Sequence, residues 1–487
     1  MTVTMIFLPI VLGIFLLCMK DFKERKHLLI LTGIYMVLSA IPAILCISNP
    51  EAGITLFHLN NALPISFAFD GIGRLFAAVV LIVWLMAGLF AFTYMGHEKN
   101  EKRYYGFYLI VFGVLMGNCS ASNMITYYVF FELLTLTSMP LVLHNQSHEA
   151  IMAALKYMFY SFAGAYMALF GLYFLYKYCY TLTFLPGGSL NMAEVMMDGK
   201  LSFVPVAALL MVLGFGVKAG MFPMHAWLPT AHPVAPAPAS AFLSAIIVKA
   251  GVLGIIRSIY YMFGITFLKG TWFQTLWMIL SLTTVFMGSM LAYREKVLKK
   301  RLAYSTVSQV SYILFGLAVM NPTAMMGSLL HVVAHAFIKS ALFLTAGAII
   351  FKTGNTKVDD LRGIGQDMPI TIWCYTIVSL GLIGIPPTGG FVSKWYLAQG
   401  ALTAEIGAFS YVGPAILLVS ALLTAGYLLP ITMKGFFPGP DYVKVKREPD
   451  SKMIIPLVVL AVLTLLVGIM PDMVTSQLTT LVESLFI

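Results

Sequence analysis

The stretch LGFGVKAGMFPMHAWLPTAHP, residues 213–233, decides the fold. It starts as an apolar run suited to a bilayer, yet it contains Lys218 and reaches Pro223 five residues later. Proline removes a backbone donor and frees the carbonyl one turn back. Inside hydrocarbon, such a break persists only where protein or water satisfies the backbone. The stretch therefore predicts a discontinuous membrane helix beside an ammonium group, as in many ion-transport sites.

A second stretch, LGLIGIPPTGGFVSKWYL (380–397), has the same design, with Pro386 and Pro387 followed by Lys394. The segment GMFPMHAW (220–227) aligns with GGFVSKWY (389–396), which places His225 opposite Lys394. Two similar broken helices in separate parts of the chain suggest an internal repeat. Five-helix units must insert in opposite orientations, so we expect an inverted repeat with functional groups near the midplane of each copy.

The composition identifies a polytopic membrane protein. The chain has 487 residues, of which 60% are hydrophobic and 10% charged, and its mean hydropathy is +0.90. We expect an all-α fold with about 14 spans, of which the seventh and twelfth are discontinuous, and read the first as a permanent helix and not a cleaved signal. The expected spans are 3–19, 27–48, 72–95, 104–121, 124–143, 151–176, 202–227, 237–262, 272–293, 301–320, 325–351, 370–400, 409–433 and 453–471, with a short interfacial helix over 474–487.

These spans suggest a division of the chain into five parts. They are an N-terminal three-helix segment (1–100), a first five-helix repeat (104–262), a linking segment (263–300) whose helix 272–293 joins the halves or begins the second, the second repeat (301–433), and a C-terminal helix with an interfacial tail (434–487).

The net charge of +10 reflects topology and does not indicate nucleic-acid binding. Twenty of the 30 lysines and arginines lie in alternate loops, near 20–26, 99–103, 294–301, 352–362 and 434–452. The opposite loops and helix edges hold only Arg74, Lys177, Lys200, Arg257 and Lys269. Because basic loops stay in the cytoplasm, we expect an inner-membrane protein with both termini outside.

Five lysines remain, and all fall inside expected spans: Lys156, Lys218, Lys249, Lys339 and Lys394. A charged residue at a helix centre costs roughly 2.5–3.5 kcal/mol, and burial weakens a lysine's preference for the charged form. Such a group can load and release a proton, whereas arginine stays protonated. Lys156 lies near its span's start, where snorkelling to the interface is the alternative. Glu132 is the one deep carboxylate that we expect, and a structural hydrogen-bonded glutamate is its alternative.

The segment LLHVVAHAFIKSALF places His331, His335 and Lys339 on one helical face, about 12 Å from end to end. Histidine titrates near neutral pH, so this face could carry protons. A zinc site and a structural histidine pair are the alternatives, but there is no HExxH and no acidic third ligand nearby. His225 could continue a path from Lys218, and His232 falls in a loop that we expect to be more exposed.

No cofactor motif stands out. Cys18, Cys46, Cys119, Cys179 and Cys374 are scattered singly, so iron–sulfur and zinc sites are not expected. There is no Walker A motif and no G-x-G-x-x-G after a strand pattern. We therefore expect no catalytic residue, metal or redox cofactor in this chain.

Five segments together resemble one family. They are FFELLTLTSMPLV (130–142), VKAGMFPMHAWLPTAHPVAPAPASAFLSAIIVKAG (217–251), RLAYSTVSQVSY (301–312), HVVAHAFIKSALFL (331–344) and LGLIGIPPTGGFVSKWYL (380–397). The chain resembles the antiporter-like proton-translocating subunits of respiratory complex I, energy-converting membrane hydrogenases and Mrp-type cation/proton antiporters. The Mrp D-type and hydrogenase subunits look nearest, because Lys394 stands where one branch of complex I subunits has glutamate.

The resemblance implies a role for each flagged residue. Glu132 would pair with Lys218, Lys249 would be the central connector and Lys394 the exit lysine. His331, His335 and Lys339 would form the relay between them. One departure is that residues 301–320 contain no carboxylate to mirror Glu132.

The hypothesis that follows is charge-coupled proton translocation. A neighbouring membrane subunit disturbs the Glu132–Lys218 pair, and the changed field drives a proton from Lys249 along the histidine face. An ion pair at 4 Å is worth roughly 4 kcal/mol at an effective dielectric of about 20, enough to switch a coupled lysine. The expected partners are other membrane subunits and lipid, with a peripheral redox module and Na⁺ left open. The alternatives are an autonomous Na⁺/H⁺ transporter and a passive scaffold for a redox module.

Overall fold

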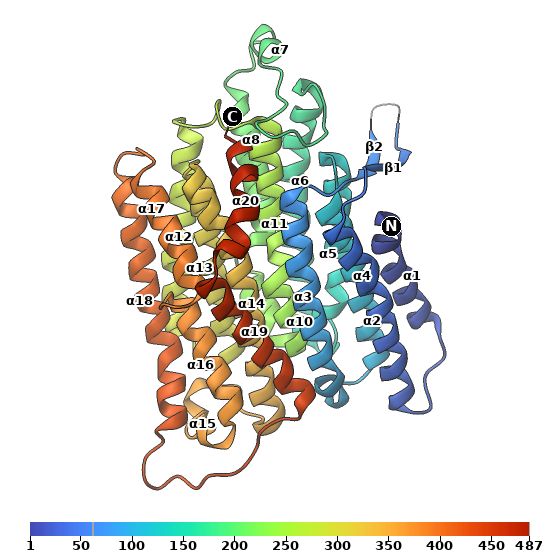
Figure 1. Cartoon of the computed structure of the whole chain (residues 1–487), viewed down its shortest axis with the longest axis vertical. Helices are drawn as coiled ribbons and strands as arrows, with labels where there is room; N and C mark the ends of the chain where they lie inside the picture. Colours follow the sequence, from blue (N-terminus) through green and yellow to red (C-terminus); the bar gives the residue numbers. More distant parts are fainter. Residues whose placement is uncertain (61–62, 487) are drawn as a thin grey trace.

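Long helices that run roughly parallel form almost the whole molecule (Figure 1). The structure, a computed structural model, describes residues 1–60 and 63–486. The first-half helices are α1 (Thr2–Cys18), α2 (Arg25–Ser48), α3 (Gly71–Tyr94), α4 (Glu101–Ser120), α5 (Met124–Val142), α6 (His148–Tyr178), α7 (Met192–Met197), α8 (Phe203–Ala219), α9 (Leu228–Val234), α10 (Ala237–Phe242) and α11 (Val248–Ser258).

The later helices are α12 (Trp272–Arg294), α13 (Leu298–Ala318), α14 (Pro322–Thr353), α15 (Ile364–Asp367), α16 (Pro369–Ile383), α17 (Gly389–Leu402), α18 (Phe409–Phe436), α19 (Ser451–Ile469) and α20 (Asp472–Ser484). Two π-helical turns, Leu243–Ile247 and Ile259–Phe263, flank α11. Two 3₁₀ turns are at Met95–His97 and Val358–Asp360.

Every expected span contains a helix. Within residues 1–60 and 63–486, nine helices are long and apolar enough to cross a membrane. Three shorter apolar helices, Thr2–Cys18, Phe203–Ala219 and Pro369–Ile383, accompany them. The fold is therefore that of a polytopic membrane protein, while the expected number of about 14 spans, the five-part division and the inverted repeat stay predictions.

Both expected helix breaks are confirmed. α8 ends at Ala219, where Gly220 has a φ of 75°, and the chain turns before α9 resumes at Leu228. α16 ends at Ile383, where Gly384 has a φ of 93°, and α17 begins at Gly389. Glycine adopts these left-handed conformations without the steric cost that a Cβ imposes.

Side-chain caps set the start of several helices. Asp70 accepts a hydrogen bond of 2.7 Å from the Gly73 amide at the start of α3. Asn123 accepts one of 2.8 Å from the Thr126 amide at the start of α5. Asn321 caps α14. These caps satisfy amides that have no partner within the helix.

α14 forms the centre of the second half. It packs against α13, α16, α17, α19 and α10, and its side chains are buried from Ala324 to Ile349. A helix that is apolar on all sides lies in a protein interior. His331, His335 and Lys339 are therefore held in the core and not at a lipid-facing surface.

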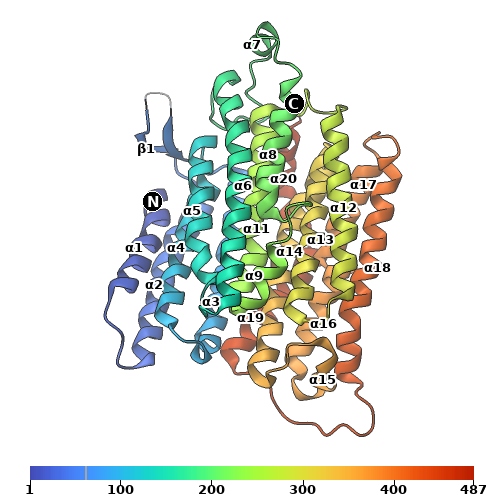
Figure 2. The same ribbon diagram turned by 180° about the vertical axis from the view of Figure 1, so that it is seen from behind.

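A small two-stranded sheet was not expected in an all-α fold. β1 (Ile54–His58) pairs antiparallel with β2 (Pro64–Phe67), with Ile54 opposite Phe67. The hairpin lies on the face where both termini are found (Figure 1). Seen from behind, α6, α8 and α9 are stacked in front of the central helices (Figure 2).

Candidate functional site

The centre of the candidate site is a contact between α11 and α14. The Nζ atom of Lys249 lies 2.7 Å from Nδ1 of His335. Lys249 is 2% exposed and His335 is fully buried. An ammonium group only donates, so a charged Lys249 requires the lone pair on Nδ1 and the ring proton on Nε2. A proton given to Nδ1 can then be matched by one released from Nε2.

His331 continues this arrangement towards the second helix break. Its ring centroid lies 5.9 Å from that of His335, and its Nδ1 lies 2.9 Å from the Ser393 hydroxyl on α17. Ser393 donates its one proton to the Gly390 carbonyl. His331 therefore donates from Nδ1 and keeps its lone pair on Nε2, which has no hydrogen-bond partner in the described residues.

Lys394 closes the break between α16 and α17. Its Nζ donates to the carbonyls of Leu382, at 2.6 Å, and Ile383, at 3.0 Å. It also lies 4.9 Å from the Tyr312 ring centre, on which His331 stacks. The broken helix thus supplies acceptors that a continuous helix would have used internally.

Lys339 shares α14 with the two histidines but contacts a different helix. Its Nζ donates to the Leu302 carbonyl at 3.1 Å and to the Ser305 hydroxyl at 2.7 Å, both on α13. It is fully buried. The three residues of the expected relay therefore share a helix, while Lys339 lies on the α13 side of it.

The expected ion pair between Glu132 and Lys218 is not formed. Lys218 donates instead to the Phe131 carbonyl at 3.0 Å and to the Thr135 hydroxyl at 2.7 Å, and the Phe131 ring centre is 4.0 Å away. Glu132 is half-buried on α5, and its Oε1 has no hydrogen-bond partner in the described chain. No ion pair forms because the ammonium turns to nearer uncharged acceptors on α5, the helix that carries Glu132. The two side chains still interact electrostatically.

Two candidates lie outside this buried group. His225 is half-buried in the turn after α8, where its ring stacks on Phe222 at 6.0 Å. Lys156, on α6, lines a cavity of about 640 Å³ with Glu149 and Phe159. The structure gives neither residue a hydrogen bond to the group around Lys249 and His335.

The exposed position expected for His232 is wrong. The residue lies in α9, is fully buried, and stacks on the Phe343 ring at a centroid distance of 4.8 Å. The run of prolines and alanines around it suggested a loop, but α9 and α10 fold it into the core. Neither ring nitrogen has a hydrogen-bond partner within the described residues.

Lys299 is a functional candidate that the sequence reasoning missed. Its neighbours Lys296, Lys300 and Arg301 place it in a basic loop in the sequence. In the structure it is 7% exposed, and its Nζ donates to the carbonyls of Pro233, at 3.1 Å, and Ala235, at 2.5 Å. It lies two residues into α13 on a buried face, which Arg301, 8% exposed, shares.

A further carboxylate, Asp70, caps the start of α3 and is 32% exposed. Arg257, which the sequence predicts at a loop or helix edge, is 1% exposed and forms a two-pronged ion pair with Asp70. The Tyr261 hydroxyl donates to the same carboxylate at 2.9 Å. Burial disfavours the Asp70 carboxylate, but the Arg257 charge outweighs that effect and holds the pKa of Asp70 below its ordinary value.

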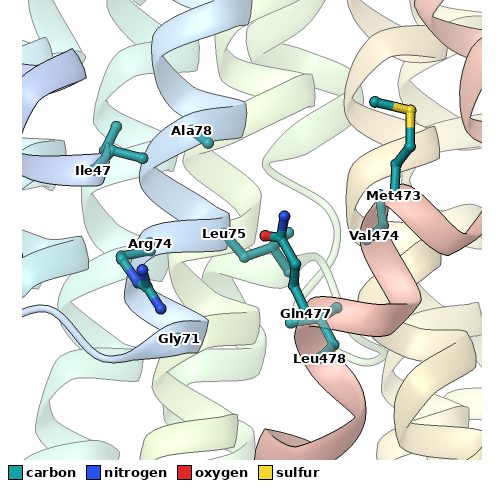
Figure 3. Close-up of a pocket in the computed structure, with 9 residues that line it drawn as sticks. All are labelled: Ile47, Gly71, Arg74, Leu75, Ala78, Met473, Val474, Gln477 and Leu478. Atoms are coloured by element: carbon teal, nitrogen blue, oxygen red, sulfur yellow. The ribbon is translucent and has the colours of Figure 1, made fainter. Parts of the chain in front are cut away.

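A cavity of about 150 Å³ lies apart from the buried lysines and histidines, between the end of α2, the start of α3 and α20. Arg74 and Gln477 face it among apolar side chains (Figure 3). Across residues 1–60 and 63–486, no group of three His, Cys, Asp or Glu residues is placed to hold a metal.

The chain matches known proteins over most of its length. A family described as NADH:quinone oxidoreductase/Mrp antiporter matches residues 121–424, and one described as the N-terminus of complex I chain 5 matches residues 57–105. An NADH-quinone oxidoreductase subunit of Desulforudis audaxviator is 33% identical, covering 82% of this chain and 81% of that protein. A Na⁺/H⁺ antiporter subunit of Bacillus subtilis is 29% identical, covering 86% and 83%.

A solved structure shares the fold. A chain of the membrane-bound sulfane sulfur reductase, an archaeal respiratory membrane complex, superposes with a TM-score of 0.84 at 24% identity. The match covers 100% of this chain and 97% of the other. Such a likeness supports the arrangement of helices described above.

Proposed function

Because the chain belongs to the NADH:quinone oxidoreductase/Mrp antiporter family of membrane subunits, we propose that it moves protons as one subunit of a multisubunit membrane complex. Its relatives include an NADH-quinone oxidoreductase subunit and a Na⁺/H⁺ antiporter subunit. We place it in the inner membrane with both termini outside, as its basic loops predict. Other membrane subunits would be its partners.

The contact between Lys249 and His335 carries the proposal. Buried, hydrogen-bonded amine and imidazole groups at the middle of a membrane protein are costly and are kept for transport. Lys249 connects to His335, His335 faces His331, and His331 reaches Ser393 beside Lys394. We call the set Lys249, His335, His331 and Lys394 the proton axis.

Each member of the proton axis has a defined task. Lys249 donates to Nδ1 of His335, whose Nε2 proton leaves towards His331. His331 holds an open lone pair on Nε2 because Ser393 fixes its tautomer. Lys394 receives the proton at the α16–α17 break, where two carbonyls stabilise its charged form. Water molecules would bridge the gaps between these groups.

Input from the rest of the complex would act at Glu132 and Lys218. Glu132 is half-buried, so a neighbouring subunit that covers its exposed part would change the cost of its charge. The carboxylate charge acts on Lys218 without a direct contact. A change at this position would alter the field along the proton axis.

The test compares two substitutions at Lys249 in the purified complex, reconstituted in vesicles with a K⁺ diffusion potential and an internal pH dye. Lys249→Met removes the proton carrier, and Lys249→Arg keeps the charge but cannot release a proton. Both should lower proton flux by about 10²-fold. Lys352→Met, at an exposed position, is the control. Full flux in the assembled Lys249→Arg complex would overturn the proposal, and the proteins that co-purify would identify the complex.

A further inference from the structure

The cavity of about 150 Å³ between α2, α3 and α20 lies where two of these helices end. Its walls include Ile47, the residue before the last of α2, and Gly71, the first residue of α3. α20 packs against α3 and forms the third wall. The hairpin that precedes α3 lies on the face of the two termini, away from the basic loops (Figure 1). We therefore assign the cavity to the outer leaflet of the membrane.

The cavity is polar towards the helix ends and apolar towards the middle of the bilayer. Arg74, in the first turn of α3, and Gln477, on α20, come from opposite sides of it (Figure 3). One turn deeper, its walls are formed by Ala78 on α3 and Met473 on α20. A phospholipid has the same order, because its phosphate lies at the surface and its acyl chains lie deeper.

Arg74 brings a positive charge that no described residue neutralises. Its side chain is exposed, and no hydrogen bond or ion pair joins it to another side chain in residues 1–60 and 63–486. The residues that line the cavity include no aspartate or glutamate. Asp70, just before α3, is already paired with Arg257. The guanidinium is therefore free to bind an anion, and its planar fork matches two oxygens of a phosphate.

Exposed apolar side chains continue from the cavity on two sides. Ile44 and Leu45 lie about one turn deeper on α2, and Ile469 and Met470 lie at the end of α19, just before α20. The cavity itself is large enough for a phosphate and its ester oxygens, which take the space of a few water molecules. It is too small for a whole lipid, so the acyl chains would lie on these apolar surfaces.

We propose that this cavity binds one phospholipid with a net negative headgroup, such as a phosphatidylglycerol. Arg74 donates to the phosphate oxygens, and the Gln477 amide donates to a further headgroup oxygen. The acyl chains lie along α2 and α19. A headgroup that carries an ammonium, as in phosphatidylethanolamine, meets the charge of Arg74 and finds no carboxylate in the lining. The bound lipid would join α20 to the ends of α2 and α3.

The test uses the assembled complex, purified in detergent and given a phosphatidylglycerol with a photoactivatable diazirine in one acyl chain. Peptide mass spectrometry locates the cross-links. We expect them in segments 44–47 and 469–473, and we expect unlabelled phosphatidylglycerol to compete at least about tenfold better than phosphatidylethanolamine. Equal competition by the two lipids would show that any membrane lipid covers this face, and would overturn the proposal.

Two substitutions of the exposed Arg74 separate its charge from its shape. Arg74→Gln should lower the cross-link yield at low probe concentration about tenfold, because it removes a charge-assisted hydrogen bond. Arg74→Lys keeps the charge and should retain most of the yield. Arg294→Gln is the matched control, since Arg294 is an exposed arginine at the end of α12, on the side of the basic loops. An unchanged yield in Arg74→Gln would overturn the proposal.

A neighbouring subunit is the alternative occupant, and the same complex distinguishes it. Gln477→Cys is labelled with a short maleimide that carries a diazirine, at an exposed position on α20. Cross-links from this label to added phosphatidylglycerol would support the lipid site. Cross-links to a peptide of another subunit, together with no lipid labelling at 44–47 or 469–473, would overturn it.

Discussion

Lys249 and His335 lie 86 positions apart in the sequence, and their side-chain nitrogens are 2.7 Å apart in the core. Both residues are flanked by apolar side chains on all-buried segments of α11 and α14. The contact couples the protonation of one group to that of the other, because an ammonium beside an imidazole disfavours a second charge on the ring. Under the proposed function, proton passage along this contact needs both groups together.

This relationship predicts a non-additive pair of substitutions. His335→Gln should lower proton flux by about 10²-fold, as should Lys249→Met. The double variant should be no slower than either single variant, because each already interrupts the same route. Initial flux in reconstituted vesicles is the measurement. Independent losses that multiply in the double variant would mean that the two residues serve separate routes.

The hydroxyl of Ser393 should matter through the tautomer of His331. Ser393→Ala removes the acceptor for His331 Nδ1 and should slow flux about tenfold, the equivalent of one hydrogen bond of about 1.4 kcal/mol. Ser393→Thr keeps the hydroxyl and should restore most of the rate. A rate that falls equally in both variants would point to packing at the Gly390 turn as the cause.

Asp70 should stabilise the fold and not serve the proton axis. Asp70→Asn leaves the buried Arg257 without its counter-charge, which should cost about 3–5 kcal/mol and lower the thermal midpoint of the detergent-solubilised complex. Asp70→Asn combined with Arg257→Met should recover part of that loss, since no charge then stays unpaired. A midpoint that is unchanged in Asp70→Asn would contradict this view.

His144 should make the turn between α5 and α6 sensitive to acid. Burial, and then the nearby Arg103 charge, lower the pKa of His144 to about 4. The unfolded state binds a proton below about pH 6.5 while the folded state does not. Stability should therefore fall by about 1.4 kcal/mol per pH unit between pH 6.5 and 4.

The check on His144 is a comparison with His144→Phe, which keeps a ring beside Tyr104. Thermal midpoints of the two proteins from pH 7 to 4.5 should diverge as the pH falls, with the variant less affected. Parallel curves would show that other groups govern the acid response.

The sequence by itself located the helical segments, both helix breaks and the buried lysines Lys218, Lys249 and Lys339. Those features depend on residue type and short spacing: Pro223 and Pro386 cannot continue a helix, and Lys218 or Lys394 in an apolar run has few roles. The same local reasoning misplaced His232, because alanine and proline runs resemble loops. It also grouped Lys299 and Arg257 with surface charges, because their neighbours in the sequence are polar or basic.

Tertiary packing alone decided which group each side chain meets. Lys218 turned to Thr135 and not to Glu132, Arg257 reached Asp70 across 187 positions, and Lys249 reached His335. A helix face is set by a period of 3.6 residues, and the sequence reveals it. Which two faces touch is set by how helices distant in the chain pack together, and only the folded structure contains that information.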